Sequence, residues 1–265
     1  MTTTAQLYEQ HSGKGPPLVV LHGLFGDSDN FRSAALHLER HMRVIRLDLP
    51  GHGHSPWQSD LSFSAMAATV QTHLSKNNVT QYHLLGHSLG GKVAMTMAGN
   101  ASGHHIGALV VVDIAPRLYP PHHLNILTAL NALPLHEIKR RSDADEQLRV
   151  AIPDAGTRHF LLKSLYRTQN KHFAWRFDLQ TLISEYEQLR HIPPISEKIQ
   201  TPTLFIKGGN SNYLTHQDEG PIKQYFEKPS FKEIGGTGHT PHAEKPAVFT
   251  KLVLDFLRLH NDQIQ

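Results

Sequence analysis

Short apolar runs alternate along the chain with segments whose apolar residues recur every three or four positions. The runs are rich in Leu, Val and Ile, and they cover residues 18–21, 43–49, 82–85, 108–114, 203–207 and 231–234. The segments with helical spacing cover residues 29–39, 62–76, 90–98 and 246–259. Because strands and helices alternate, the pattern predicts an α/β fold, a mostly parallel sheet with helices on both faces.

One stretch interrupts this alternation. The segment between Pro116 and Pro202 has few strand signals, and it is too long for a connection without structure. We therefore expect an α/β core over residues 1–116 and 201–265 and an inserted helical cap over residues 117–200. The insertion carries two apolar stripes, Leu124, Leu127, Leu130 and Leu133, then Phe160, Leu161, Leu162, Leu165 and Tyr166. The stripes either pack the insertion or line an acyl pocket beneath a lid.

Charge and cysteine content narrow the class of protein. Lys and Arg number 26 against 23 Asp and Glu and are scattered, so we expect no nucleic-acid partner. The chain has no cysteine, which excludes disulfides and a cysteine nucleophile. Residues 1–10 contain neither a basic n-region nor an apolar h-region, so we expect a cytoplasmic, soluble protein without a membrane span. We expect a monomer or a small homo-oligomer.

The pentapeptide Gly86-His87-Ser88-Leu89-Gly90 stands between an apolar run and a helical segment. This is the strand, sharp turn and helix that a nucleophile elbow needs. A side chain at position 86 or 90 would clash with the adjacent strand or helix, which accounts for the two glycines. Ser88 is therefore the candidate nucleophile, to be activated by a neighbouring base.

Two loops are expected to supply backbone donors for an oxyanion. A tetrahedral intermediate needs two preorganised N–H groups, one after the nucleophile and one in the loop that follows an earlier strand. Leu89 N–H is the first. In the loop of residues 21–26, Leu24 N–H is favoured as the second and Phe25 N–H is the alternative. A plain strand-to-helix turn is the other interpretation of that loop.

A histidine near the C-terminus is the candidate general base. His239 follows the last predicted strand and three nearby glycines, which would let the loop approach the serine. The chain holds 21 histidines, most of which we expect to be solvated. His242, three residues further on, is the alternative base.

The acid of the triad is placed by elimination and by charge. Residues 208–213, after the strand at 203–207, hold no carboxylate, and the next one is Asp218. Asp113, in contrast, ends a strand of apolar residues at the edge where α/β sites gather. A charge in such a run costs several kcal/mol unless it is paired, so we assign Asp113 as the partner of His239. Asp113 as a cap of the following turn, or Asp218 as the acid, are the alternatives.

The remaining histidines and glycine-rich segments are expected to be structural. Residues 48–55 form a tight loop that supports the fold. His52 with His54 and His104 with His105 are expected in surface loops, without a metal-ligand cluster.

These segments resemble the α/β-hydrolase superfamily and, more closely, the small YbfF-like esterases. The resemblance covers nearly the whole chain, through residues 22–26, 86–92, 112–116, 175–177, 208–211, 238–239 and 242–246. It implies a helical cap, no cofactor, and the acid at Asp113. The pair Thr240-Pro241 departs from the family's usual aromatic-aliphatic pair, which affects the pocket shape rather than the triad.

The sequence therefore predicts a serine hydrolase that cleaves carboxyl esters or acyl thioesters, including acyl-CoA, through an acyl-enzyme. The alternatives are another reaction of the same fold, by a carbon–carbon hydrolase, lyase or perhydrolase, and a non-catalytic binding module.

Overall fold

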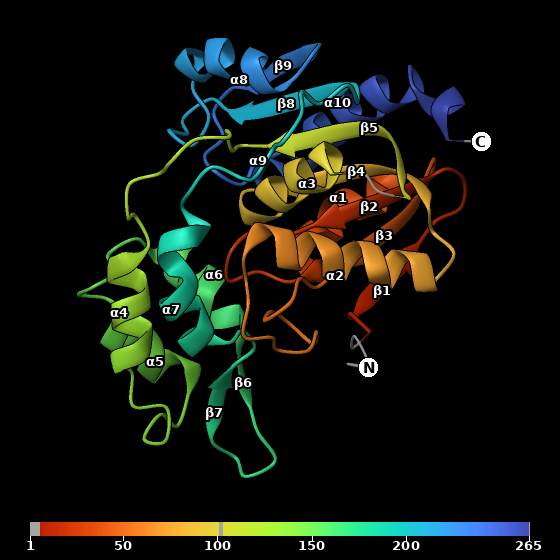
Figure 1. The fold of residues 1–265 in the computed structure, drawn as a ribbon. Helices are drawn as coiled ribbons and strands as arrows, with labels where there is room; N and C mark the ends of the chain where they lie inside the picture. Colours follow the sequence, from red (N-terminus) through yellow and green to blue (C-terminus); the bar gives the residue numbers. More distant parts are fainter. Residues whose placement is uncertain (1–5, 101–102, 265) are drawn as a thin grey trace.

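The computed structural model describes residues 6–100 and 103–264, so the opening segment in which we expect no leader lies partly outside it. A seven-stranded sheet has the order β1-β3-β2-β4-β5-β8-β9 (Figure 1). Every neighbouring pair is parallel except β1 with β3. The strands are β1 Glu9–Ser12, β2 Pro17–Leu21, β3 Arg43–Leu47, β4 Gln81–His87, β5 His105–Val112, β8 Thr203–Gly208 and β9 Pro229–Ile234. The predicted fold class is confirmed.

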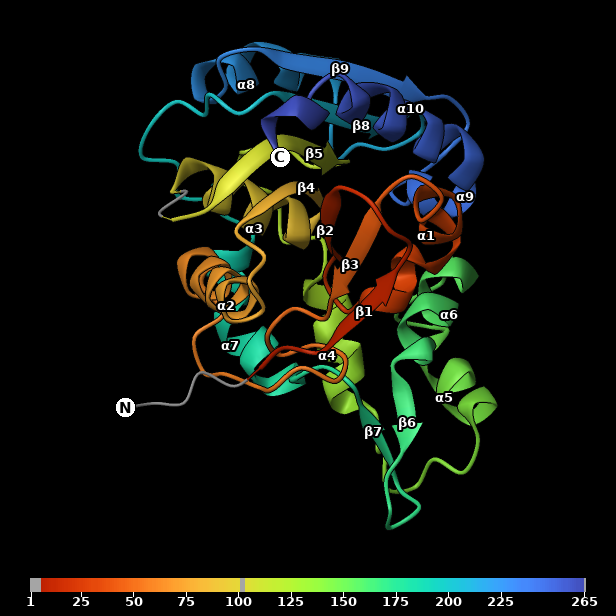
Figure 2. The same ribbon diagram turned by 90° about the vertical axis from the view of Figure 1, so that its right-hand side faces the viewer.

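Helices cover both faces of the sheet. One face packs on α2 Phe63–Lys76, α3 Leu89–Gly99 and α8 Glu219–Tyr225, and the other on α1 Arg32–Leu38 and α10 Pro246–Arg258 (Figure 2). In β2, Leu18 and Val20 pack towards α1 and α10, whereas Val19 and Leu21 pack towards α2 and α3. This period of two fixes the register, because a slip by one residue would exchange the two cores.

The segment between β5 and β8 forms a separate group of elements beside the carboxyl ends of the strands (Figure 1). It contains α4 Leu124–Ala132, α5 Arg141–Leu148, α6 Ala155–Lys163 and α7 Leu179–Leu189. It also contains a two-stranded antiparallel hairpin, β6 Leu165–Arg167 and β7 Phe173–Trp175, which the sequence pattern does not predict. We call residues 117–200 the insertion.

The strand order reverses beside β2, whose neighbours are β3 and β4. Ligands of open α/β sheets bind at such a reversal, outside the carboxyl ends of the strands. The remaining short elements are the 3₁₀ turns at Ser28–Phe31, His216–Asp218 and Asn261–Gln263 and the short helix α9 Pro241–Glu244.

Candidate active site

Ser88 lies at the sharp turn between β4 and α3. Its φ is 52°, in the left-handed region that L-residues rarely adopt, and it is 8% exposed. A Cβ atom on Gly90 would lie 2.5 Å from the carbonyl oxygens of Leu21 and His22, and one on Gly86 would overlap the Gly90 carbonyl. The prediction that both positions require glycine is confirmed. The strained turn projects the serine hydroxyl from the edge of the sheet.

His239 reaches this serine from the loop after β9. Its Nε2 lies 3.0 Å from Ser88 Oγ. The loop is fixed by His87, whose Nε2 donates to the His239 carbonyl at 2.8 Å, and by Tyr213, whose ring stacks on the imidazole with centroids 3.7 Å apart. Burial lowers the pKa of His239, so the ring is neutral and can accept a proton.

Asp113 completes the line of polar groups. Its Oδ2 lies 2.7 Å from His239 Nδ1, and the side chain is fully buried. Gly208 N donates to Asp113 Oδ1 at 3.0 Å, and the Ser211 hydroxyl donates to Oδ2. Burial raises the pKa of Asp113, and the bonds from Ser211 and Gly208 oppose that change. The structure thus brings Ser88, His239 and Asp113 together.

The loop after β8 supplies a partner for Asp113 that our sequence reasoning missed. Ser211 is only 8% exposed, and its Oγ also accepts from Tyr213 N at 3.2 Å. The sequence signal that could have found it is the position of Ser211 within residues 208–213, the segment after β8 that holds no carboxylate. Asp218, the alternative acid, pairs with Arg117 Nε at 2.9 Å instead.

The loop after β2 aims one backbone N–H away from its own turn. The Gly23 carbonyl accepts from Gly26 N at 3.1 Å and from His22 Nδ1 at 2.8 Å. The His22 proton is on Nδ1 because Nε2 accepts from Leu49 N at 2.9 Å. Since the peptide is planar and trans, the Leu24 N–H points opposite to the Gly23 carbonyl.

Leu89 provides a second such group. It is the first residue of α3, where a backbone N–H has no partner within the helix. Among the described residues, neither Leu24 N nor Leu89 N donates to a protein acceptor. Leu24 and Leu89 both line the cavity beside Ser88, whereas Phe25, the alternative donor, is not among its lining residues, and its ring packs on Phe177 with centroids 5.2 Å apart.

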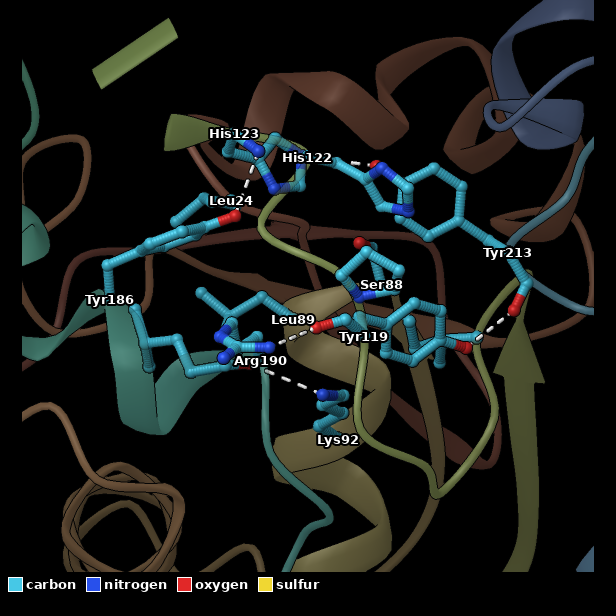
Figure 3. A pocket seen from close by; sticks show the side chains of 13 residues that line it. Leu24, Ser88, Leu89, Lys92, Tyr119, His122, His123, Tyr186, Arg190 and Tyr213 are labelled. Carbon is cyan, nitrogen blue, oxygen red and sulfur yellow. Dashed lines mark hydrogen bonds between the residues drawn. The ribbon is translucent and has the colours of Figure 1, made fainter. Parts of the chain in front are cut away.

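A cavity opens in front of the serine (Figure 3). Its core side is lined by Leu24, Ser88, Leu89, Lys92 and Ile114, with Tyr213 beside them. Its other side is lined by the insertion, through Tyr119, Pro120, His122, His123, Tyr186, Leu189 and Arg190. Of the two interpretations of the apolar stripes, packing of the insertion is the one that the structure supports, and none of the stripe residues, all of which the structure describes, lines the cavity. Leu127, Leu130 and Leu161 are at most 2% exposed within the apolar core, so the stripes pack the insertion.

Lys92 ties the insertion to the helix that follows the serine. Its Nζ donates to the carbonyls of Leu189 at 3.3 Å and His191 at 2.6 Å, at the end of α7. Figure 3 shows this side chain below Ser88 along α3. The ammonium lies 4.8 Å from the centroid of the Tyr119 ring. Burial lowers the pKa of Lys92 to about 7.

Several histidines lie in the core rather than in surface loops. His52 is fully buried, with its ring 5.2 Å from that of His22, and His104 is 9% exposed. The expectation of surface positions for these two is therefore wrong. His242, the alternative base, stacks on Phe31 with centroids 4.1 Å apart. Ring stacking and core packing thus account for histidines that carry no obvious chemistry.

Within residues 6–100 and 103–264, no group of three or more His, Cys, Asp or Glu side chains could hold a metal ion. Across the same residues, no helix has both the length and the apolar character needed to cross a bilayer.

The fold and this site define an α/β-hydrolase. Residues 16–149 match the family model described as the alpha/beta hydrolase fold, so the chain belongs to that family. A solved marine microorganism esterase has a TM-score of 0.91 and 31% identity, covering 95% of this chain and 99% of its own.

Curated relatives show which branch of the family the chain resembles. Esterase YbfF of Escherichia coli (strain K12) is 32% identical over 252 residues, which are 94% of this chain and 95% of YbfF. The sn-1-specific diacylglycerol lipase ABHD11 of Mus musculus is 35% identical over 250 residues, covering 91% of this chain and 81% of the lipase. The resemblance to YbfF-like esterases is confirmed, and the chain is an ester hydrolase of this family.

Proposed function

We propose that the chain is a serine esterase that works through an acyl-enzyme. His239 Nε2 accepts the proton of Ser88 Oγ while this oxygen attacks the ester carbonyl carbon. Asp113 orients the imidazole and stabilises its charged form, and the N–H groups of Leu24 and Leu89 donate to the oxyanion. His239 then transfers the proton to the departing alcohol oxygen as the ester bond breaks.

Water then hydrolyses the acyl-enzyme, with the same residues acting in the reverse order. His239 removes a proton from the water as its oxygen attacks the acyl carbon, and the same proton returns to Ser88 as the acid leaves. The observation that carries this proposal is the unbroken line of hydrogen bonds from Ser88 Oγ through both ring nitrogens of His239 to Asp113, at 3.0 and 2.7 Å.

We infer that the insertion acts as a cap that selects the acyl group and limits water. It supplies one wall of the cavity in front of Ser88, and Lys92 fixes that wall to α3. Apolar walls with a few placed polar groups suit an acyl chain. A thioester, including acyl-CoA, enters the same chemistry because only the leaving group changes. The esterases and the diacylglycerol lipase among the relatives favour carboxyl esters as the main substrates.

Replacement of the nucleophile tests the proposal. Ser88→Ala should lose on the order of 10⁶ in kcat on p-nitrophenyl esters, because no other hydroxyl can form the acyl-enzyme. Ser142→Ala, on the exposed face of α5, is the matched control and should retain full activity. Substantial turnover by Ser88→Ala would refute the assignment. Failure of a fluorophosphonate to label Ser88 in the parent chain would favour a non-catalytic module instead.

Rates on two matched series then define the substrate. Esters and acyl-CoA thioesters of graded chain length differ only in leaving group and acyl size. We expect a maximum in kcat/KM at the acyl length that fills the cavity. Equal kcat/KM values at all chain lengths in both series would refute the proposal that the insertion selects the acyl group.

A further inference from the structure

The turn that presents the Leu24 N–H contains a strained residue. Gly26 N donates to the Gly23 carbonyl, and Phe25, at the third position of this four-residue turn, has a φ of 62°. Such a turn ordinarily has glycine at that position, since a Cβ atom there is strained. A non-glycine residue in this region costs about 1–3 kcal/mol, and it persists only where its surroundings hold it.

The insertion provides the contacts that hold Phe25. Ser164 Oγ, at the end of α6, donates to the Phe25 carbonyl at 3.0 Å. The rings of Phe177 and His123 lie 5.2 and 6.0 Å from the Phe25 ring. All three partners come from residues 117–200, more than 90 positions along the chain from the turn.

Ser164 is itself fixed and shielded from water. Ser164 is only 4% exposed. Its backbone N donates to the Leu161 carbonyl at 3.0 Å, and its carbonyl accepts from Arg176 N at 2.8 Å. A buried hydroxyl with both backbone groups anchored has little freedom to turn away, so the bond to Phe25 holds one geometry.

The hydrogen bond from Ser164 to Phe25 affects the direction of the Leu24 N–H, because Phe25 and Leu24 belong to the same turn. If Phe25 relaxed to a negative φ, Gly26 N would leave the Gly23 carbonyl, because the i to i+3 bond depends on the dihedrals of the two central residues. The peptide between Gly23 and Leu24 would then keep only the bond from His22 Nδ1. The direction of the Leu24 N–H would be less well defined, and an oxyanion donor must be fixed in advance to be effective.

We propose that Ser164 is a positioning residue that holds the oxyanion turn in its strained form, so that the chain reaches its full rate only with the insertion seated against the core. The proposal rests on the proposed function, in which Leu24 N–H stabilises the oxyanion. It assigns the insertion a part in the chemical step in addition to acyl selection.

Ser164→Ala tests this role through the split between kcat and KM. We expect kcat on a p-nitrophenyl ester, per folded molecule, to fall between about tenfold and about a hundredfold, less than the 10²–10³ lost when a donor is removed outright. KM should change little, because the substrate's ground state does not use the oxyanion donors fully. Binding of a trifluoromethyl ketone, which forms an oxyanion on Ser88, should weaken in proportion to kcat.

Ser184→Ala is the matched control. Ser184 Oγ also donates to a backbone carbonyl of the insertion, that of Thr181 at 3.0 Å, but Ser184 is exposed on α7 and its hydroxyl does not bond the turn, so its removal should leave kcat unchanged. Ser164→Cys serves if the alanine variant does not fold, since it keeps the side-chain volume with a weak S–H donor, and we expect an intermediate loss.

Each outcome separates the two proposals. Parent-like kcat and ketone affinity in both Ser164 variants, with Ser88→Ala inactive, would overturn the role of Ser164 and leave the esterase proposal standing. A loss of activity explained entirely by a smaller folded fraction, measured by thermal unfolding, would also overturn it. Activity retained in Ser88→Ala would instead refute the esterase mechanism itself.

Discussion

Acidification should destabilise the fold through its buried histidines, and His52 allows this effect to be measured for one residue. His52 is fully buried, and its Nδ1–H donates to the Pro50 carbonyl at 3.0 Å. Burial, and to a lesser extent the neighbouring His22, lowers the pKa of His52 to about 3. The folded state therefore keeps this ring neutral under conditions in which the unfolded chain, with an ordinary pKa of about 6.5, takes up a proton.

The sign and magnitude follow from this difference. Stability falls as the pH falls wherever the unfolded state binds more protons, which for His52 is between about pH 6.5 and its lowered pKa. Between about pH 7.5 and about pH 5 the unfolded state gains about 2 kcal/mol from protonating this one histidine. That is a large fraction of a typical free energy of unfolding of about 5–15 kcal/mol.

Urea unfolding, followed by tryptophan fluorescence at the two pH values, checks the figure. His52→Asn keeps a donor for the Pro50 carbonyl but cannot titrate, so its loss of unfolding free energy between the two pH values should be smaller by about 2 kcal/mol. Other titrating groups, including Asp113, cancel in this comparison. The exposed His136 gives the control, and His136→Asn should behave as the parent. Equal losses in the parent and His52→Asn would refute the reasoning.

Two further predictions concern the triad and the elbow. Asp113→Asn should lower kcat by about 10⁴, because the amide stabilises the wrong tautomer of His239, and a parent-like kcat in steady-state assays would move the acid elsewhere. Gly86→Ala should lower the melting temperature strongly, since the added Cβ overlaps the Gly90 carbonyl, whereas Gly220→Ala, in open space on α8, should raise it slightly.

The sequence predicts those parts of the fold whose residues are close together along the chain and form a recognisable pattern of apolar and polar positions. The strand, turn and helix around Ser88 are contiguous, and the apolar run before Asp113 makes its charge conspicuous. The strand β1 carries Glu9 and His11 at an antiparallel edge, with no apolar signature. The hairpin of β6 and β7 has only three residues in each strand, too few for a period of two to be evident.

The cavity walls could not be predicted for a different reason. Tyr119 and Tyr186 are 67 positions apart, and neither belongs to an apolar stripe. They meet at the serine because the insertion returns to the core beside its own starting point, where Tyr119 N donates to the Arg190 carbonyl at 2.9 Å. Such proximity depends on how whole elements pack. Ser211 eluded prediction likewise, since its importance comes from the buried carboxylate opposite it.

The long separation between the proposed nucleophile and its proposed base has a consequence during biosynthesis. Ser88 and His239 are 151 positions apart, and His239 follows the last strand of the sheet, β9. A nascent chain whose β4 and α3 have already left the ribosome therefore carries Ser88 but does not yet carry His239, which would deprotonate it. If the proposed triad carries the reaction, hydrolysis requires that β9 has paired with β8, so catalytic activity would appear only after the last strand has joined the sheet.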